Sequence, residues 1–252
     1  MTELLRVDHL SKQYPGFSLR DISFSVKPGR IMGLIGKNGA GKSTTLKSIL
    51  NMVRPESGTV TMLGKDFYKN EKECKQDIGV VFGGIDFYPL KKLSAITSVT
   101  RRFYKNWDQE RYHDYLRQFS LDENKQFRSL SNGMKVKYLL ALALSHHATL
   151  YLLDEPTSGL DPVSRDEILH IFTRIVKDGK RSVLFSTHIT SDLDRCADDI
   201  TYIQNGKVLQ SADKDTFLHS FEHLKTAEDT SPLTLEEIML RTEGRTLDET
   251  AL

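Results

Sequence analysis

A glycine-rich segment that joins an apolar run to a helical pattern constrains the fold of this chain most strongly. Residues 31–35 are almost wholly apolar, and after position 42 apolar residues recur at helical spacing. The segment between them reads Gly36, Lys37, Asn38, Gly39, Ala40, Gly41, Lys42, Ser43. This spacing, G-x-x-x-x-G-K-S, lets backbone N–H groups turn inward around an anion at the N-terminus of a helix. The segment therefore predicts a loop that binds phosphate groups.

Two side chains at the end of this loop suit a nucleoside triphosphate and its metal ion. Lys42 is placed to reach the β- and γ-phosphates of ATP, and Ser43 is placed to ligate Mg²⁺. An ordinary glycine-rich turn is the alternative, but the Lys-Ser pair at the helix start argues against it. We therefore expect residues 36–43 and Thr44 to bind ATP, with Lys42 also acting in catalysis.

An acidic pair follows another apolar run later in the chain. Residues 150–153 are Leu-Tyr-Leu-Leu, and Asp154 and Glu155 come directly after them. Because doubly wound α/β sheets bind ligands at the carboxyl ends of their strands, we expect both carboxylates near the phosphate loop. Asp154 is expected to hold the metal ion, and Glu155 to act as the general base for the attacking water. An Asp-Glu pair at a strand end usually has only a structural role. Its combination with a phosphate loop favours a functional role instead.

The remaining pattern predicts alternating strands and helices with one helical insertion. Strands are predicted at residues 5–14, 17–26, 30–35, 59–63, 78–82, 149–153 and 182–186. Helices are predicted at residues 42–52, 136–144, 162–177 and 189–196. Residues 199–210, with Asn205-Gly206 at their centre, predict a hairpin with a primed turn. Alternation of this kind is typical of a parallel sheet covered by helices, and the helical patterns between 88 and 148 indicate an insertion.

Composition excludes several classes of protein. The 252 residues are 38% hydrophobic and 27% charged, which indicates a globular chain. The longest apolar run, residues 139–144, is far shorter than the roughly 20 residues that span a bilayer, and we expect no secretion signal. Cys74 and Cys196 form no metal-binding pattern and are expected to be reduced thiols. A net charge of +1 argues against a general nucleic-acid binder.

Two later motifs resemble those of a known family. The segment Asp-Glu-Pro-Thr-Ser-Gly-Leu-Asp-Pro at 154–162, followed by Ser-Thr-His at 186–188, resembles the nucleotide-binding domains of ABC transporters, over roughly residues 3–215. The resemblance implies an α/β fold: a P-loop NTPase (RecA-like) core with an antiparallel β subdomain and an inserted α-helical subdomain. It implies that residues 158–161 form the D-loop, which contacts the opposite subunit, and assigns Asp161 to the nucleotide site. It also implies that His188 is the catalytic switch histidine at the γ-phosphate and that Tyr14 stacks on adenine.

Two positions depart from the family pattern. The signature usually written L-S-G-G-Q reads Leu-Ser-Asn-Gly-Met at residues 130–134. Ser131 and Gly133 are retained, and by the resemblance they contact the γ-phosphate held by the partner chain. Gly83 stands where the family has the Q-loop glutamine. Whether Asp86 or a water molecule takes over that role is left open.

The resemblance also implies partner chains. Two ATP-binding subunits, identical or different, are expected to close head to tail around two ATP molecules and to drive a transmembrane permease that is a separate chain. The chain is then expected in the cytoplasm, peripheral on the inner face of the cell membrane. Residues 1–87 and 149–215 would form the ATPase core with its β subdomain, and 88–148 the helical subdomain with the signature motif. Residues 216–252 would form a solvated, helical C-terminal tail.

Charge is distributed unevenly along the chain. Residues 91–137 hold eleven basic and five acidic residues, and residues 225–252 hold seven acidic and three basic ones. Aromatic residues lie among the basic ones at Phe103, Tyr104, Trp107, Tyr112 and Tyr115. Three interpretations are open: a solvated helix surface with the aromatics in the subdomain core, a face near anionic lipid headgroups or the permease, and a nucleic-acid surface. By family analogy a permease helix would dock around residues 83–88, where Phe87 and Tyr88 are apolar enough to receive it.

Three functions compete on this basis. The first is an ATP-hydrolysing subunit that powers export, of peptides or antimicrobial compounds, because residues 103–108 resemble such exporters. The second is a regulatory subunit that hydrolyses ATP slowly beside a more active partner, which Gly83 and Asn132 favour and which Glu155 and His188 oppose. The third, a mechanical ATPase acting on DNA or ribosomes, lacks the coiled coil or second nucleotide domain it would need. We therefore expect no nucleic-acid partner.

Overall fold

Two sheets organise the molecule, for which the computed structural model describes residues 3–82, 88–226 and 229–244. Within these residues a six-stranded sheet has the order β10-β9-β3-β8-β7-β6, in which only β10 runs antiparallel to its neighbour. Its strands, in that order, are Lys207–Asp213, Asp199–Gln204, Ile31–Ile35, Ser182–Thr187, Leu150–Asp154 and Ile78–Phe82. A smaller antiparallel sheet has the order β2-β1-β4-β5. Its strands are Phe17–Val26, Leu5–Tyr14, Ser57–Met62 and Lys65–Asp66.

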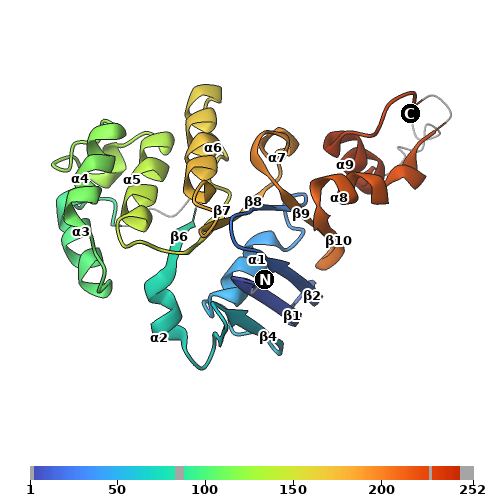
Figure 1. Cartoon of the computed structure of the whole chain (residues 1–252), viewed down its shortest axis with the longest axis horizontal. Helices are drawn as coiled ribbons and strands as arrows, with labels where there is room; N and C mark the ends of the chain where they lie inside the picture. Colours follow the sequence, from blue (N-terminus) through green and yellow to red (C-terminus); the bar gives the residue numbers. More distant parts are fainter. Residues whose placement is uncertain (1–2, 83–87, 227–228, 245–252) are drawn as a thin grey trace.

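Helices cover the large sheet, and further helices lie at both ends of the molecule (Figure 1). Their bounds are α1 Lys42–Ile49, α2 Glu71–Cys74, α3 Leu93–Thr100, α4 Gln109–Gln118, α5 Asn132–Leu144, α6 Pro162–Val176, α7 Thr190–Cys196, α8 Lys214–Ser220 and α9 Leu235–Glu243. In Figure 1 the green α3, α4 and α5 lie at one end and the red α8 and α9 at the other, with the sheets between them. This is the predicted α/β architecture, with an antiparallel β sheet and an inserted group of helices.

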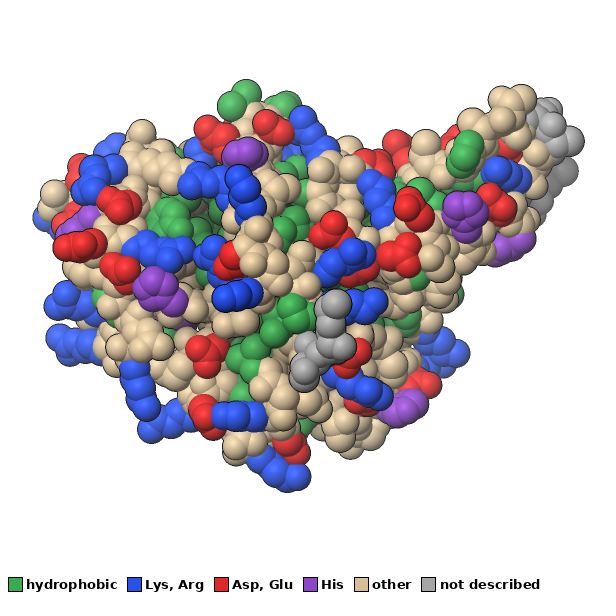
Figure 2. Space-filling view, in the orientation of Figure 1, with side chains coloured by type: hydrophobic (Ala, Val, Ile, Leu, Met, Phe, Trp, Pro, Cys, Tyr) green, Lys and Arg blue, Asp and Glu red, His purple; other side chains and the backbone are tan. Residues whose placement is uncertain are grey.

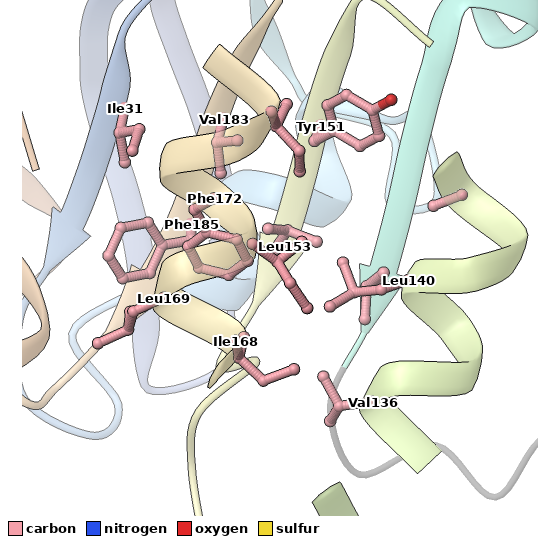
Figure 3. Close-up of a cluster of buried hydrophobic side chains, with 14 of the residues drawn as sticks. Ile31, Val136, Leu140, Tyr151, Leu153, Ile168, Leu169, Phe172, Val183 and Phe185 are labelled. Atoms are coloured by element: carbon pink, nitrogen blue, oxygen red, sulfur yellow. The ribbon is translucent and has the colours of Figure 1, made fainter. Parts of the chain in front are cut away.

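The central strands β9, β3, β8 and β7 are buried on both faces because successive apolar side chains point to opposite sides. On β7, Leu150 and Leu152 belong to one core cluster, with α1 and the small sheet, whereas Tyr151 and Leu153 belong to the other, with α5 and α6. Figure 3 shows the second cluster, in which side chains of α5 and α6 meet those of β7 and β8. The sheet is therefore a rigid layer between two cores, and its strand ends are fixed in position.

The predicted elements are found with small shifts at their ends. The strands at 5–14, 17–26 and 78–82 match the structure, and the hairpin has positive φ at Asn205 and Gly206, as a primed turn requires. The helix predicted at 136–144 begins earlier, at Asn132, because the Ser131 hydroxyl caps it. The helix predicted at 42–52 ends at Ile49, before Asn51 takes a φ of 56°. The short elements α2 and β5 were not predicted.

The aromatic residues among the basic ones pack mostly inward. Tyr112 is fully buried, Trp107 and Tyr115 pack partly buried against the core, and Tyr104 stacks on His146 at 3.7 Å between ring centroids. Phe103 differs, because 70% of it is exposed. The interpretation that places these aromatics in a helical core is therefore confirmed except at Phe103. On the visible face of these helices, acidic and basic side chains are intermixed (Figure 2).

The prediction of a solvated C-terminal tail is wrong for its apolar residues. Leu233, Leu235 and Ile238 are at most 5% exposed and belong to the larger core cluster. Arg241 of α9 makes a two-pronged ion pair with Asp229, at 2.5 and 2.6 Å. Apolar burial at helical spacing along α9 outweighs the acidic composition of the segment, so this helix docks on the body of the protein.

Candidate functional site

The predicted phosphate loop lies between β3 and α1, as its sequence context indicates. Gly41 caps α1 with a φ of 116°, and its carbonyl accepts the first helical hydrogen bond, from the Thr45 amide at 2.8 Å. The positive φ favours glycine here, and a Cβ would lie 2.6 Å from Leu19 Cδ2, so any other residue would also displace the Leu19 side chain. The N-terminus of α1 therefore presents free amide groups to the loop, which favours an anion.

Lys42 is buried inside the loop that it follows. Only 5% of its side chain is exposed, and its ammonium donates to the carbonyl oxygens of Gly36 at 2.7 Å and Lys37 at 3.3 Å. The loop is also held from outside, because the Gly206 amide donates to the Ala40 carbonyl at 2.9 Å. These contacts fix a positive charge in the hollow of the loop.

The two carboxylates are brought to the loop at the end of β7. Asp154 Oδ1 accepts hydrogen bonds from Ser43 Oγ at 2.9 Å and from Ser186 Oγ at 2.6 Å. Ser186 lies opposite Asp154 in the β7–β8 register and also accepts a hydrogen bond from the Glu155 amide at 2.8 Å. Ser186 thus positions both acidic residues, a contribution that motif spacing alone did not reveal.

Glu155 joins the loop to the end of the next strand. Its Oε1 lies 3.1 Å from Lys42 Nζ, and its Oε2 lies 2.8 Å from His188 Nδ1. Its backbone is left-handed, with a φ of 49°, which costs about 1 kcal/mol for a residue with a Cβ. The sequence prediction that these three side chains meet at one place is met by the geometry.

A cleft of about 490 Å³ opens over the loop. Its lining residues are Phe17, Asn38, Gly39, Gly41, Lys42, Ser43, Thr44, Glu155, Ser158 and His188. The aromatic ring in this lining is Phe17, which pairs in register with Tyr14 across the turn between β1 and β2. Tyr14 is 37% exposed, with Lys12 Nζ 5.6 Å from its ring centroid, and its adenine-stacking role stays a prediction. An aromatic pair flanking Pro-Gly was the signal that could have found Phe17.

Ser158, the first residue of the D-loop, lines this cleft, whereas Ser131, Gly133 and Asp161 lie at helix starts outside its described lining. Ser131 Oγ accepts from the Met134 amide at 3.3 Å, and Asp161 Oδ1 accepts from the amides of Val163 and Ser164 at 3.1 and 3.0 Å. Hydrogen bonds from Ser164 and Val163 hold the pKa of the Asp161 carboxyl below its usual value. Gly133 is buried, and a Cβ there would lie 3.0 Å from Ser164 Oγ. Their assignment to a nucleotide held by a partner chain stays a prediction.

Several expectations fall outside the described residues, or concern absences within them. Gly83, Asp86 and Phe87 lie outside the described ranges. Across residues 3–82, 88–226 and 229–244, no group of three or more His, Cys, Asp or Glu side chains is arranged to hold a metal ion. No helix in the same ranges has the length and apolar character to cross a bilayer.

The tail helix reaches this site unexpectedly. Glu243, at the end of α9, pairs with Lys37 Nζ at 2.8 Å and accepts a hydrogen bond from the Tyr202 hydroxyl at 3.0 Å. Gln204, also near the loop, donates to the Thr242 carbonyl at 3.0 Å. The phosphate loop is therefore in contact with a segment some 200 residues away in the sequence, which no local pattern could indicate.

Comparison with known proteins identifies the family of this fold and site. The family model described as ABC transporter matches residues 19–158, more than half of the chain. The ABC transporter ATP-binding protein YtrB of Bacillus subtilis (strain 168) is 29% identical over 228 residues, which cover 90% of this chain and 78% of that protein. The bacitracin transport ATP-binding protein BcrA of Bacillus licheniformis is 30% identical over 228 residues, with coverage of 89% and 72%.

A solved structure agrees with these relatives. The ATP binding subunit of an ABC transporter superposes with a TM-score of 0.82 at 27% identity, over 95% of this chain and 99% of that one. Phosphate loop, acidic pair and histidine are thus set in the fold of that family, at the carboxyl ends of the strands. The chain belongs to the ABC transporter family, as an ATP-binding subunit whose ATPase activity is coupled to transport.

Proposed function

We propose that this subunit hydrolyses ATP with its own Glu155, Lys42 and His188, and so drives export of a peptide or antimicrobial compound through a separate permease. The observation that carries the catalytic part is the Glu155 carboxylate, held between Lys42 Nζ at 3.1 Å and His188 Nδ1 at 2.8 Å. The similarity to BcrA, a bacitracin transport protein, supports the export part. The same Glu155–His188 contact weighs against a slowly hydrolysing, regulatory subunit.

The charges at the phosphate loop imply that ATP binds before Glu155 can act as a base. Lys42 is held in the loop by two carbonyl oxygens, and its ammonium attracts the β- and γ-phosphates of ATP. The phosphates then replace Glu155 as the partner of Lys42, which frees Glu155 Oε1 to take a proton from the attacking water. His188 keeps the other carboxylate oxygen in place through Nδ1. Glu155 Oε1 is therefore available to accept a proton only when ATP is bound.

Magnesium is the metal ion that fits the residues here. Ser43 Oγ and Asp154 Oδ1 are oxygen donors 2.9 Å apart. Mg²⁺ is usually held in proteins by only one or two such oxygens together with substrate phosphates, so the absence of a larger ligand cluster among the described residues is compatible with it. We propose that Ser43 and Asp154 hold Mg²⁺, which when bound offsets the charge of the phosphates.

We propose that the working unit contains two nucleotide subunits, identical or different. Ser131 and Gly133 at the start of α5, with Asp161 at the start of α6, would complete a cleft on the partner chain. Both helices have 13 or more residues, so their N-termini carry a favourable dipole for a phosphate. In this arrangement residues 1–87 and 149–215 form the ATPase core, 88–148 carry the signature, and 216–252 form the tail.

The permease is proposed to dock beside the helical region, which would hold the chain at the inner face of the cell membrane, in the cytoplasm. The exposed apolar side chains Leu90, Val99 and Phe103, at 61%, 52% and 70%, support this placement. Most of the predicted docking segment, including Phe87, lies outside the described residues. Phe87→Ala is expected to leave ATP binding intact while uncoupling transport in vesicles.

One experiment tests the proposal as a whole. ATP turnover is measured for the purified chain, alone and with its permease, beside Glu155→Gln and a control variant Glu222→Gln, which alters a surface carboxylate that is 53% exposed. We expect turnover by the wild type and the control, and none above background by Glu155→Gln. A wild type as inert as Glu155→Gln under both conditions would overturn the catalytic assignment.

A further inference from the structure

A buried carboxylate links two segments of the site. Asp192 lies on α7, four residues after His188, and is fully buried. Its Oδ2 accepts hydrogen bonds from Thr157 Oγ1 at 2.6 Å and from Thr187 Oγ1 at 3.4 Å. Thr157 directly precedes the D-loop segment 158–161, and Thr187 directly precedes His188. One oxygen atom therefore contacts the hydroxyl groups of the residues that directly precede the D-loop and His188.

The second oxygen of Asp192 faces a cation without bonding to it. Asp192 Oδ1 lies 3.8 Å from Arg165 Nε, and within the described residues neither atom has a hydrogen-bond partner. Hydrogen bonds of this kind form at 2.7–3.2 Å, so a shift of about 1 Å would close the pair. The Arg165 amide donates to the Asp161 carbonyl at 3.0 Å, which ties Arg165 to the end of the D-loop.

The two facing atoms are both buried and lack a hydrogen bond, although the Arg165 side chain as a whole is 28% exposed. Such a gap between oppositely charged groups is unfavourable. Burial raises the pKa of the Asp192 carboxyl, while the hydrogen bond from Thr157 and the charge of Arg165 oppose this rise. Unpaired buried polar atoms destabilise the arrangement, and closing the gap would satisfy both at once. The described structure therefore contains a contact that is improved by moving α6 toward α7.

We infer that Asp192 is a positioning residue that couples the D-loop to His188, with its pair to Arg165 open in the present state and closed during turnover. The inference rests on the proposed catalytic roles of Glu155 and His188. When the D-loop is pressed by a partner subunit, α6 and Arg165 move onto Asp192 Oδ1. Because Oδ2 already holds Thr187, the same movement fixes His188 against Glu155.

The chain offers a matched control of the same chemistry. Arg30 and Asp199 also form an Arg–Asp pair, but it is closed, with Nη2–Oδ1 at 2.6 Å and Nε–Oδ2 at 2.9 Å. It lies at the opposite edge of the large sheet, where β3 and β9 begin. Loss of the Arg30–Asp199 pair should lower folding stability without changing the coupling between the D-loop and His188.

The test compares the isosteric variant Asp192→Asn, Arg165→Gln, their double variant, and Asp199→Asn as control. For each, kcat and KM for MgATP and the melting temperature are measured. We expect Asp192→Asn and Arg165→Gln each to lower kcat about tenfold, with KM changed less than about twofold, because positioning and not ATP binding is lost. The double variant should be no slower than either single one, since both remove the same contact. Asp199→Asn should lower only the melting temperature.

Three results would overturn the inference while leaving the proposed function intact. They are an unchanged kcat in Asp192→Asn, effects of the two single variants that multiply in the double variant, and a kcat loss equal to that of Asp199→Asn at matched folded fraction. The proposed function is judged separately, by turnover of the wild type against Glu155→Gln. A wild type without turnover would contradict both.

Discussion

The two edges of the six-stranded sheet treat charge differently. At the amino-terminal edge, Arg30 and Asp199 form a closed two-pronged pair, and Asp198 Oδ2 accepts a hydrogen bond from the Ile31 amide at 2.8 Å. At the carboxyl-terminal edge, the Glu155 backbone is left-handed and the Asp192–Arg165 pair is open. The amino-terminal edge has a fully closed pair, whereas the carboxyl-terminal edge combines the satisfied carboxylates of Asp154 and Glu155 with one open pair.

This difference separates stability from function. Loss of either partner of a closed buried pair destabilises the folded protein. A closed pair, however, gains no additional hydrogen bond from a conformational change. Open pairs and strained backbone persist only where the surrounding structure holds them, and such positions cluster at functional sites. The central strands, which are buried on both faces, separate the closed pair at one edge from the open pair at the other.

The largest effect is expected at the carboxyl-terminal edge, from Glu155→Gln. Loss of a general base lowers kcat by about 10²-fold or more, while the amide still fills the same space and ATP binding is retained. Turnover and binding of a fluorescent ATP analogue measure the two quantities separately. Retained turnover in the folded variant would show that the acidic pair is not the source of the base.

Lys42→Ala is expected to weaken ATP binding by about tenfold or more, because it removes a charged donor from the phosphate loop. Lys47→Ala is a suitable control, since Lys47 lies in the last turn of the same helix. Titration with the same fluorescent analogue provides the measurement. Equal affinities in the two variants would argue that the loop binds phosphate by its backbone alone.

At the amino-terminal edge, Asp199→Asn is expected to lower the free energy of unfolding by about 2 kcal/mol. This is below the range for fully buried pairs, because about a third of the Arg30 side chain is exposed. Urea unfolding measures the loss, and kcat at a temperature where the variant is folded should stay at the wild-type value. A reduced kcat at that temperature would contradict the claim that the amino-terminal edge affects stability and not turnover.

Two serines on β8 allow the same comparison within one strand. Ser186, at the carboxyl end, joins Asp154 to the Glu155 amide, whereas Ser182, at the amino end, donates to the Lys27 carbonyl at 2.8 Å. Each Ser→Ala change removes hydrogen bonds worth about 1 kcal/mol. We expect Ser186→Ala to lower kcat about fivefold and Ser182→Ala to lower stability alone. The opposite assignment of the two effects would contradict the comparison.

The smallest effect concerns α7, which runs between the two edges. Burial raises the pKa of the Cys196 thiol to about 12, and burial also raises that of Cys74. At pH 8 the Cys196 thiol is therefore almost wholly protonated, and both thiols should react more slowly with iodoacetamide than in the unfolded chain, because the thiolate is the nucleophile. Mass spectrometry of native protein against a urea-unfolded sample measures this. Fast labelling of Cys196 in the native protein would indicate that α7 opens readily.

Most of the fold followed from local patterns, because these strands are short apolar runs bounded by Gly and Pro. The phosphate loop was predictable for the same reason, since its residues are contiguous. Ser186, Phe17 and Glu243 reach the site from separate elements, and their contributions depend on register and packing that spacing does not encode. The burial of Leu235 and Ile238 was missed because acidic neighbours dominate the composition of that segment.

The backbone of Glu155 has a consequence for substitutions at this position. A residue with a φ of 49° invites replacement by glycine, which adopts that conformation without steric cost. Glu155→Gly would relieve this backbone strain, but it would also remove the carboxylate that pairs with Lys42 and His188. The proposed base thus stands where backbone strain and the two ion pairs of its carboxylate act in opposite directions on stability.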